Sequence, residues 1–170
     1  GVLLIGFLIQ IVLNPPVKII NDFMFGALNS MGGVSRVLLG AVLGGMMAVD
    51  MGGPVNKAAY VFGTASIAEG NYEIMAAVMI GGMVPPIAIA LCGTFFKNRF
   101  TEKEQKSSEV NYVMGLSFIT EGAIPFAAAD PARVIPACAI GSAAAGGLSM
   151  FFGCSLRAPH GGIFVLPIME

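Results

Sequence analysis

Charge is what this chain has least of. Only 11% of its 170 residues are Asp, Glu, Lys or Arg, whereas ordinary soluble domains have about 25%. Such a chain lacks the charged side chains that cover a water-exposed surface. Its net charge of −1 indicates neither nucleic acid nor an anionic surface as a partner.

Cysteine and histidine are also scarce, and neither supports metal or redox chemistry. Cys92, Cys138 and Cys154 are an odd number, lie in apolar surroundings and form no CxxC pair, which is typical of small buried residues. The acidic residues are scattered and there is a single His, so we expect no metal site and no cofactor. Neither a phosphate-binding GxxxxGK[ST] loop nor a strained nucleophile motif occurs.

Apolar and small residues make up most of the sequence. Hydrophobic residues account for 56%, and the chain has 23 Gly and 10 Pro but no Trp. This combination is typical of polytopic membrane proteins, in which small residues allow helices to pack closely. The alternating pattern of a membrane β-barrel is absent, so we predict an all-α bundle of transmembrane helices. We interpret residues 1–170 as the middle to C-terminal part of a single transmembrane domain, truncated at both ends.

Apolar runs and their interruptions predict where the helices lie. Residues 74–96 carry no charge and are long enough to span a bilayer, with a kink at Pro85-Pro86. Residues 97–109 are the one strongly charged segment, which the positive-inside rule predicts to be a cytoplasmic loop. The other expected elements are the tail of a membrane helix at 2–13, an interfacial helix at 16–31, a glycine-rich helix at 34–49, a short apolar stretch at 58–68 and a small-residue helix at 134–152, packed deep inside the bundle.

Polar residues, glycine and proline interrupt the apolar pattern in three places, at residues 50–57, 115–126 and 154–162. Broken backbone at membrane depth is tolerated only where it is buried in protein or lines a cavity. The second interruption lies within residues 110–129, which are broken at Gly122 and Pro125, so that both a re-entrant hairpin and a span remain open. Together the three interruptions predict a buried polar site.

Glu121 is the clearest sign of such a site. It lies in an otherwise uncharged run, where an acidic side chain at the bilayer centre costs about 2.5–3.5 kcal/mol even on the mild insertion scale. A carboxylate on broken backbone within a membrane therefore indicates function and a polar ligand. The alternative is a buried structural ion pair between Glu121 and Arg157 or Lys57.

The interruptions supply further polar side chains that suit a neutral, hydroxyl-rich ligand such as a sugar. A carboxylate accepts hydroxyl hydrogen bonds, an imidazole donates or accepts, and an amide does both. The candidates are Asp50, Asn56, Lys57, Thr120, Glu121, Arg157 and His160. Asp50, Lys57 and Arg157 can instead lie at the membrane interface, where they would be solvated or paired.

Three motifs in order resemble a known family. They are DMGGPVNKAAY at 50–60, GLSFITEGAIPF at 115–126 and RAPHGG at 157–162. Together they resemble the membrane-embedded IIC component of fructose-type (fructose/mannitol family) sugar phosphotransferase systems. The resemblance implies hairpin-like elements near the substrate, for which residues 50–70 and 111–130 are candidates. It also implies that Glu121 is catalytic and that Asp50, Asn56, Lys57, Thr120, Glu121 and His160 bind the sugar.

The resemblance further implies a multi-pass homodimer in the lipid bilayer of a bacterial inner membrane, acting with IIA and IIB components. The IIC domain would bind fructose and release it inside as a phosphate ester. The phosphoryl-donor cysteine of IIB is not in this chain, which would then be one part of a sugar phosphotransferase. Judged from the residues alone, two alternatives stay open: an ion-coupled secondary sugar transporter with Glu121 as proton or sodium relay, and a structural or sensory subunit.

Overall fold

The computed structural model of the chain describes residues 33–169, and this part consists of helices and turns. Its α-helices are α3 (Gly33–Val49), α4 (Pro54–Ala68), α5 (Glu73–Phe95), α6 (Glu102–Leu116), α7 (Ile124–Ala129) and α8 (Pro131–Phe151). Its 3-10 segments are η2 (Lys97–Arg99), η3 (Thr120–Ala123) and η4 (Gly162–Ile168). The predicted all-α class is confirmed, while the helices expected at 2–13 and 16–31 lie outside the described residues.

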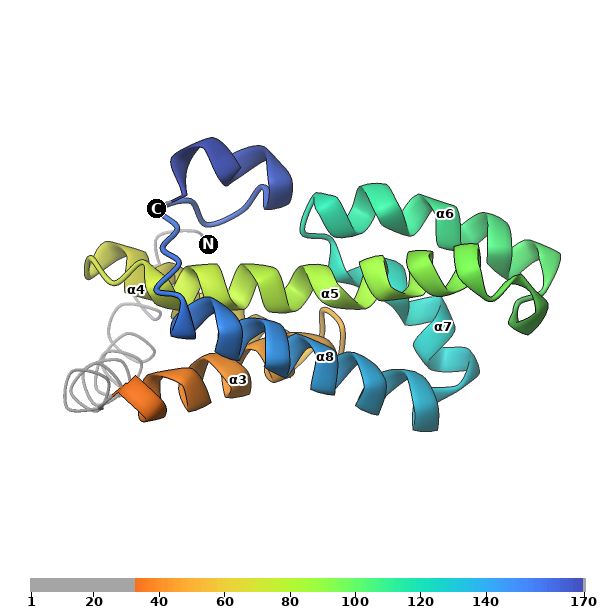
Figure 1. The fold of residues 1–170 in the computed structure, drawn as a ribbon, viewed down its shortest axis with the longest axis horizontal. Helices are drawn as coiled ribbons and strands as arrows, with labels where there is room; N and C mark the ends of the chain where they lie inside the picture. The colour runs from red at the N-terminus through yellow and green to blue at the C-terminus, as the bar shows by residue number, and fades with distance from the viewer. Residues whose placement is uncertain (1–32, 170) are drawn as a thin grey trace, which may run out of the picture.

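Helix α5 runs through the middle of the molecule, and α3, α4, α6 and α8 pack around it (Figure 1). More than half of its residues are buried, including Ile74, Met75 and Val78. It continues as one helix through Pro85 and Pro86, where the sequence predicted a kink. Among residues 33–169, α5 and α8 are the helices long and apolar enough to cross a membrane.

Glycine allows α3 and α8 to pack backbone against backbone. A side chain at Gly40 would overlap the Gly146 carbonyl, and one at Gly44 would overlap the Ser142 carbonyl. The close packing predicted from small residues is therefore present. It covers only one face of α8, because Ile140, Leu148 and Phe151 on that helix are exposed, so α8 is less deeply enclosed by these residues than the sequence predicted.

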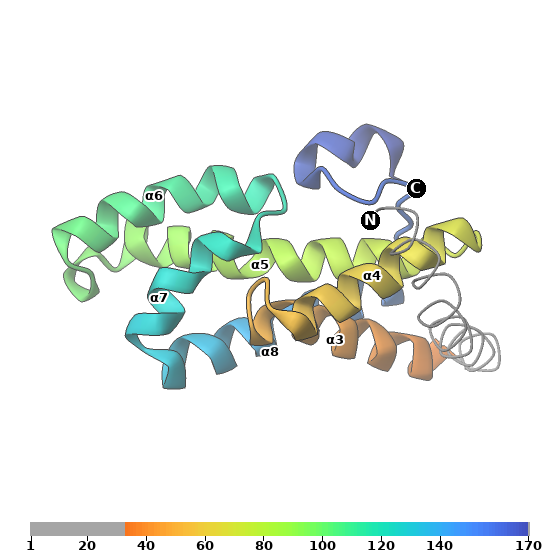
Figure 2. The ribbon, with the colours of Figure 1, turned by 180° about the vertical axis from the view of Figure 1, so that it is seen from behind.

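Two helical hairpins enter from opposite ends of the molecule and meet beside the middle of α5 (Figures 1 and 2). The first joins α3 to α4 through a break at Asp50–Gly53, in which Met51 has a φ of 46° and Gly52 a φ of 115°. The second joins α6 to η3 and α7 through a break at residues 117–119, in which Phe118 has a φ of 62°. We call each break, together with the first helical turn that follows it, a tip: the α3–α4 tip is residues 50–57 and the α6–α7 tip is residues 117–123.

The boundaries of both breaks differ from the prediction. The first break is shorter, since Pro54 opens α4 at the position where a missing N–H costs nothing, and Asn56 and Lys57 lie in the first turn of that helix. The second break precedes Glu121. Gly122 lies within η3, and Pro125 lies in the first turn of α7 rather than ending a helix.

The prediction that the charged segment 97–109 forms a loop is wrong, because α6 begins inside this segment at Glu102. Thr101 and Glu104 form a capping box, in which the Thr101 hydroxyl accepts from the Glu104 N–H and the Glu104 carboxylate accepts from the Thr101 N–H. These hydrogen bonds from Thr101 lower the pKa of the Glu104 carboxyl. The T-x-x-E spacing is the signal in the sequence that marks this helix start.

Candidate functional site

A cavity of about 210 Å³ lies where the two tips meet. Residues from all three predicted interruptions contribute to its wall, although they are up to about a hundred positions apart in the chain. Its lining residues are Met47, Asn56, Lys57, Tyr60, Phe118, Ile119, Thr120, Glu121 and His160. Five of the six residues predicted to bind substrate are in this set, and Asp50 is the exception.

Asp50 organises the α3–α4 tip instead of lining the cavity. Its carboxylate oxygens accept hydrogen bonds from the Val55 and Asn56 N–H groups, at 2.6 and 2.9 Å. These are two of the N–H groups that a helix start leaves without a partner, so Asp50 caps α4. The buried Asn56 side chain then donates from Nδ2 to the Met47 carbonyl at 2.7 Å, which ties the start of α4 to α3.

An ion pair joins the two tips across the cavity. Lys57 Nζ lies 3.3 Å from Glu121 Oε1, and the two side chains are 57% and 45% exposed. Gly52 lies against the same carboxylate, and a side chain there would come within 2.8 Å of Glu121 Oε1. Of the two partners proposed for Glu121 from the sequence, the structure places Lys57 beside it. Arg157 lies elsewhere, 5.1 Å above the Tyr72 ring.

Aromatic rings form another part of the wall. The Phe118 ring lies between Tyr60 and His160, with centroid distances of 6.1 and 5.1 Å. The His160 loop reaches Phe118 through Gly162, whose φ is 58° and where a side chain would overlap the Leu116 carbonyl. This close approach of two backbones brings the third motif to the α6–α7 tip.

Thr120 joins the same tip to α5. Its side chain is 3% exposed, and its hydroxyl donates to the Gly82 carbonyl at 2.8 Å. The hydroxyl proton is therefore used within the protein, and only the oxygen lone pairs remain for a ligand. Glu121 follows directly in the chain, so this hydrogen bond fixes the backbone next to the carboxylate.

Tyr60 and Phe118 are cavity residues that the sequence analysis did not single out. Tyr60 follows Asn56 by four positions on α4, so helical spacing places both on one face, and this was a usable signal. Phe118 gave no such signal, because its position depends on a positive φ that bulky residues rarely adopt.

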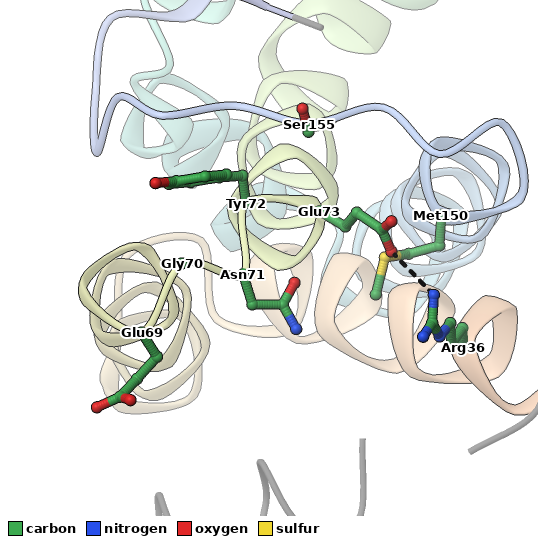
Figure 3. Close-up of a pocket in the computed structure, with 8 residues that line it drawn as sticks. All are labelled: Arg36, Glu69, Gly70, Asn71, Tyr72, Glu73, Met150 and Ser155. Carbon is green, nitrogen blue, oxygen red and sulfur yellow. Dashed lines mark ion pairs between the residues drawn. The ribbon is translucent and has the colours of Figure 1, made fainter. Parts of the chain in front are cut away.

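A second polar pocket, of about 370 Å³, lies at the end of the molecule where α4 ends and α5 begins (Figure 3). Arg36 and Glu73 form an ion pair across it at 3.8 Å, while Glu69 points away from that pair. None of the predicted site residues lines this pocket. The cavity between the tips is smaller, but it holds the unusual carboxylate, and we take it as the candidate site.

The cavity's chemistry suits a small polyhydroxyl molecule. It offers a carboxylate, an ammonium, an amide and an imidazole beside aromatic rings. Ligand sites of this kind combine apolar walls with a few placed polar groups.

Comparison with known proteins identifies the family of the chain. The model of the family "Phosphotransferase system, EIIC" matches residues 1–141. The chain belongs to this family.

Curated relatives of this EIIC chain carry fructose in their names. It is 55% identical over 97% of its length to the "PTS system fructose-specific EIIABC component" of Bacillus subtilis, and 55% identical over 97% to the "Fructose permease IIC component" of Bacillus amyloliquefaciens. It is 48% identical over 98% to the "PTS system fructose-specific EIIB'BC component" of Escherichia coli. The chain spans 26%, 54% and 30% of these relatives. No solved structure matches it.

An EIIC is a membrane component of the phosphotransferase system, and this agrees with α5 and α8 as candidate spans. The two tips lie beside the middle of α5, one of these candidate spans. Broken backbone at membrane depth is tolerated where it lines a cavity, and both tips line one.

Proposed function

We propose that this chain is part of the sugar-translocating component of a phosphoenolpyruvate-dependent phosphotransferase system, which binds fructose and transports it with phosphorylation by a IIB domain. The family match and the names of the relatives support the reaction and the sugar. The observation that carries the site is the convergence of three separated motifs on one cavity at the meeting of two broken hairpins.

Glu121 is the proposed catalytic group. Its carboxylate accepts a hydrogen bond from the sugar hydroxyl that is to be phosphorylated and takes the proton from that hydroxyl. The hydroxyl oxygen forms a bond to the phosphorus carried by the IIB cysteine as the phosphorus–sulfur bond breaks. Lys57, 3.3 Å from Glu121, holds the carboxylate in place until the sugar arrives.

The remaining cavity residues hold the sugar through the groups that the protein itself leaves available. Asn56 offers its Oδ1, because its Nδ2 donates to the Met47 carbonyl. His160 offers an imidazole nitrogen beside the Phe118 ring. Thr120 offers its oxygen lone pairs. Asp50 supports this set through the start of α4, and we assign it no direct contact with the sugar.

The proposed assembly follows from the same family. The chain would form part of a single transmembrane IIC domain that acts as a homodimer in the bacterial inner membrane, with residues 97–109 on the cytoplasmic side. It would work with IIA and IIB components. The name EIIABC of one relative combines A, B and C, and the name EIIB'BC of another combines B and C. Release of a charged phosphate ester inside would prevent the sugar from returning.

The direct test is uptake of labelled fructose by vesicles that contain the full-length parent protein, with and without phosphorylated IIB. We expect fructose phosphate to accumulate only with the phosphorylated partner. Accumulation of free fructose driven by a proton or sodium gradient would instead make Glu121 an ion relay and overturn the proposal.

The substitution Glu121→Gln tests the site itself. The amide keeps the shape of the carboxylate but cannot take a proton, so we expect phosphorylation to fall about 100-fold or more. Glu69→Gln is the matched control, since Glu69 is exposed at the other end of α4 and should leave transport unchanged. Retained binding and phosphorylation in Glu121→Gln would refute the role assigned to Glu121.

A further inference from the structure

Two adjacent prolines remove two adjacent hydrogen bonds from α5. In an α-helix each N–H donates to the carbonyl four residues earlier, and proline has no N–H. Pro85 therefore leaves the Gly81 carbonyl without its helical partner, and Pro86 does the same for Gly82. Both prolines are fully buried, so water is not the natural substitute.

Both freed carbonyls have taken hydroxyl partners from other parts of the chain. Ser142 of α8 donates to the Gly81 carbonyl at 2.7 Å. Thr120 of the α6–α7 tip donates to the Gly82 carbonyl at 2.8 Å. Ser142 is 0% and Thr120 3% exposed, so both hydrogen bonds lie in the protein interior. The prolines and the hydroxyls match one to one.

The absence of a side chain at Gly82 permits the contact with the α6–α7 tip, and its absence at Gly81 permits the close approach of α3. A side chain at Gly82 would overlap the Phe118 ring and come within 3.0 Å of Thr120 Oγ1. One at Gly81 would come within 2.6 Å of the Gly44 backbone in α3. The run from Gly81 to Pro86 thus combines room for close approach with acceptors that α5 does not itself use.

We propose that Pro86 and Thr120 are a positioning pair: Pro86 frees the Gly82 carbonyl, and Thr120 uses it to hold the tip that carries Glu121. Pro85 and Ser142 form the equivalent pair that holds α8 to the preceding residue of α5. The pairing of each proline with a hydroxyl, which is the structural half of the inference, does not depend on a substrate. The positioning of Glu121 by Thr120, which is the other half, rests on the proposed function.

A crossed set of double variants in the full-length protein tests the structural half. Thr120→Val removes the hydroxyl and leaves the Gly82 carbonyl buried without a partner, which should lower Tm by roughly 2–6 °C. Adding Pro86→Ala supplies an N–H to that same carbonyl, so the double variant should be more stable than the two single effects predict. Ser142→Ala with Pro85→Ala should show the same rescue.

The mismatched combinations are the controls. Thr120→Val with Pro85→Ala, and Ser142→Ala with Pro86→Ala, supply an N–H to the wrong carbonyl and should show no rescue. Equal behaviour of matched and mismatched pairs would overturn the inference, as would simple additivity in all four. Each proline substitution occurs once in a matched and once in a mismatched pair. The stability lost with the packing of the proline ring is therefore the same in both and does not affect the comparison.

Kinetics of fructose phosphorylation test the positioning half. We expect Thr120→Val to lower kcat about 10- to 100-fold, because Glu121 is displaced from its reacting position. It should also raise KM, because the oxygen that is proposed to contact the sugar is lost, and Thr120→Ser should restore most of both. The Thr120→Val, Pro86→Ala double variant should regain stability without regaining kcat, since the carbonyl is satisfied but the tip is no longer held. A normal kcat in Thr120→Val would refute the positioning role. If neither the wild-type protein nor any variant phosphorylates fructose, the proposed function fails. The stabilities of the matched and mismatched variants would still show whether each proline is paired with its hydroxyl.

Discussion

The two tips that meet at the cavity look alike in the ribbon but are held in different ways (Figure 2). The α3–α4 tip is held by its own residues. Asp50 caps the start of α4, and Asn56 binds the Met47 carbonyl of α3. Each of these hydrogen bonds joins residues fewer than ten positions apart.

The α6–α7 tip is held mainly from outside. Thr120 is bound to a carbonyl of α5, Gly162 lies against the Leu116 carbonyl, and Phe118 lies between rings from α4 and the third motif. The tip that carries Glu121 therefore depends on three other parts of the chain. A site held in this way can be repositioned by changes at any of them, which would suit the change of access that the proposed transport requires.

The largest expected effect comes from Gly162→Ala, which disrupts the support that the α6–α7 tip receives from the loop around Gly162. The added methyl group would overlap the Leu116 carbonyl, and alanine is also strained at a φ of 58°. We expect a loss of about 3 kcal/mol or more in stability, with loss of fructose binding. Thermal unfolding and binding of labelled fructose by the full-length protein measure both effects.

Gly153→Ala is the control for backbone strain alone. Gly153 has a φ of 66°, close to that of Gly162, but no atom lies near the position of an added side chain. It should cost only about 1–2 kcal/mol and leave binding intact. Equal losses in the two variants would mean that the contact with Leu116 does not support the tip.

A smaller effect is expected from Asp50→Ala, which removes the hydrogen bonds that hold the α3–α4 tip from within. Removing a side chain that caps two helical N–H groups should cost about 1–2 kcal/mol. Asp50→Asn keeps one acceptor oxygen and should lose less. If fructose binding follows stability in both variants, Asp50 is a supporting residue. A loss of fructose binding in Asp50→Asn at unchanged stability would show that Asp50 contacts the sugar directly.

The same contrast explains how far the sequence could predict the fold and the site. The α3–α4 tip is encoded locally, by Asp50 before Gly53-Pro54, and the prediction erred there only in extending the break beyond Pro54. Glu121 was identified because a lone carboxylate in an apolar run is costly. The exact break before it was not predicted, since no local pattern signals the positive φ of Phe118, whose ring packs against Gly82 of α5 and His160.

Long-range partners were the part that local sequence patterns do not specify. Thr120 was predicted to bind the sugar, and no periodicity in the chain shows that its hydroxyl reaches Gly82. The missing N–H groups of Pro85 and Pro86 are visible in the sequence, but which hydroxyls replace them depends on the tertiary fold. The charged segment was a different kind of error, because the capping signal at Thr101 and Glu104 was present and was overlooked.

The smallest effect on stability should come from the contact that joins the two tips. The Lys57–Glu121 pair is about half exposed, and such pairs contribute about 0.2–1 kcal/mol. Lys57→Met, Glu121→Gln and the double variant form a cycle that measures this coupling by thermal unfolding. A coupling of about 2 kcal/mol or more would show that the pair itself holds the tips together. We expect less, because each tip has its own buried support, so that the ion pair is free to open when a sugar hydroxyl takes its place beside Glu121.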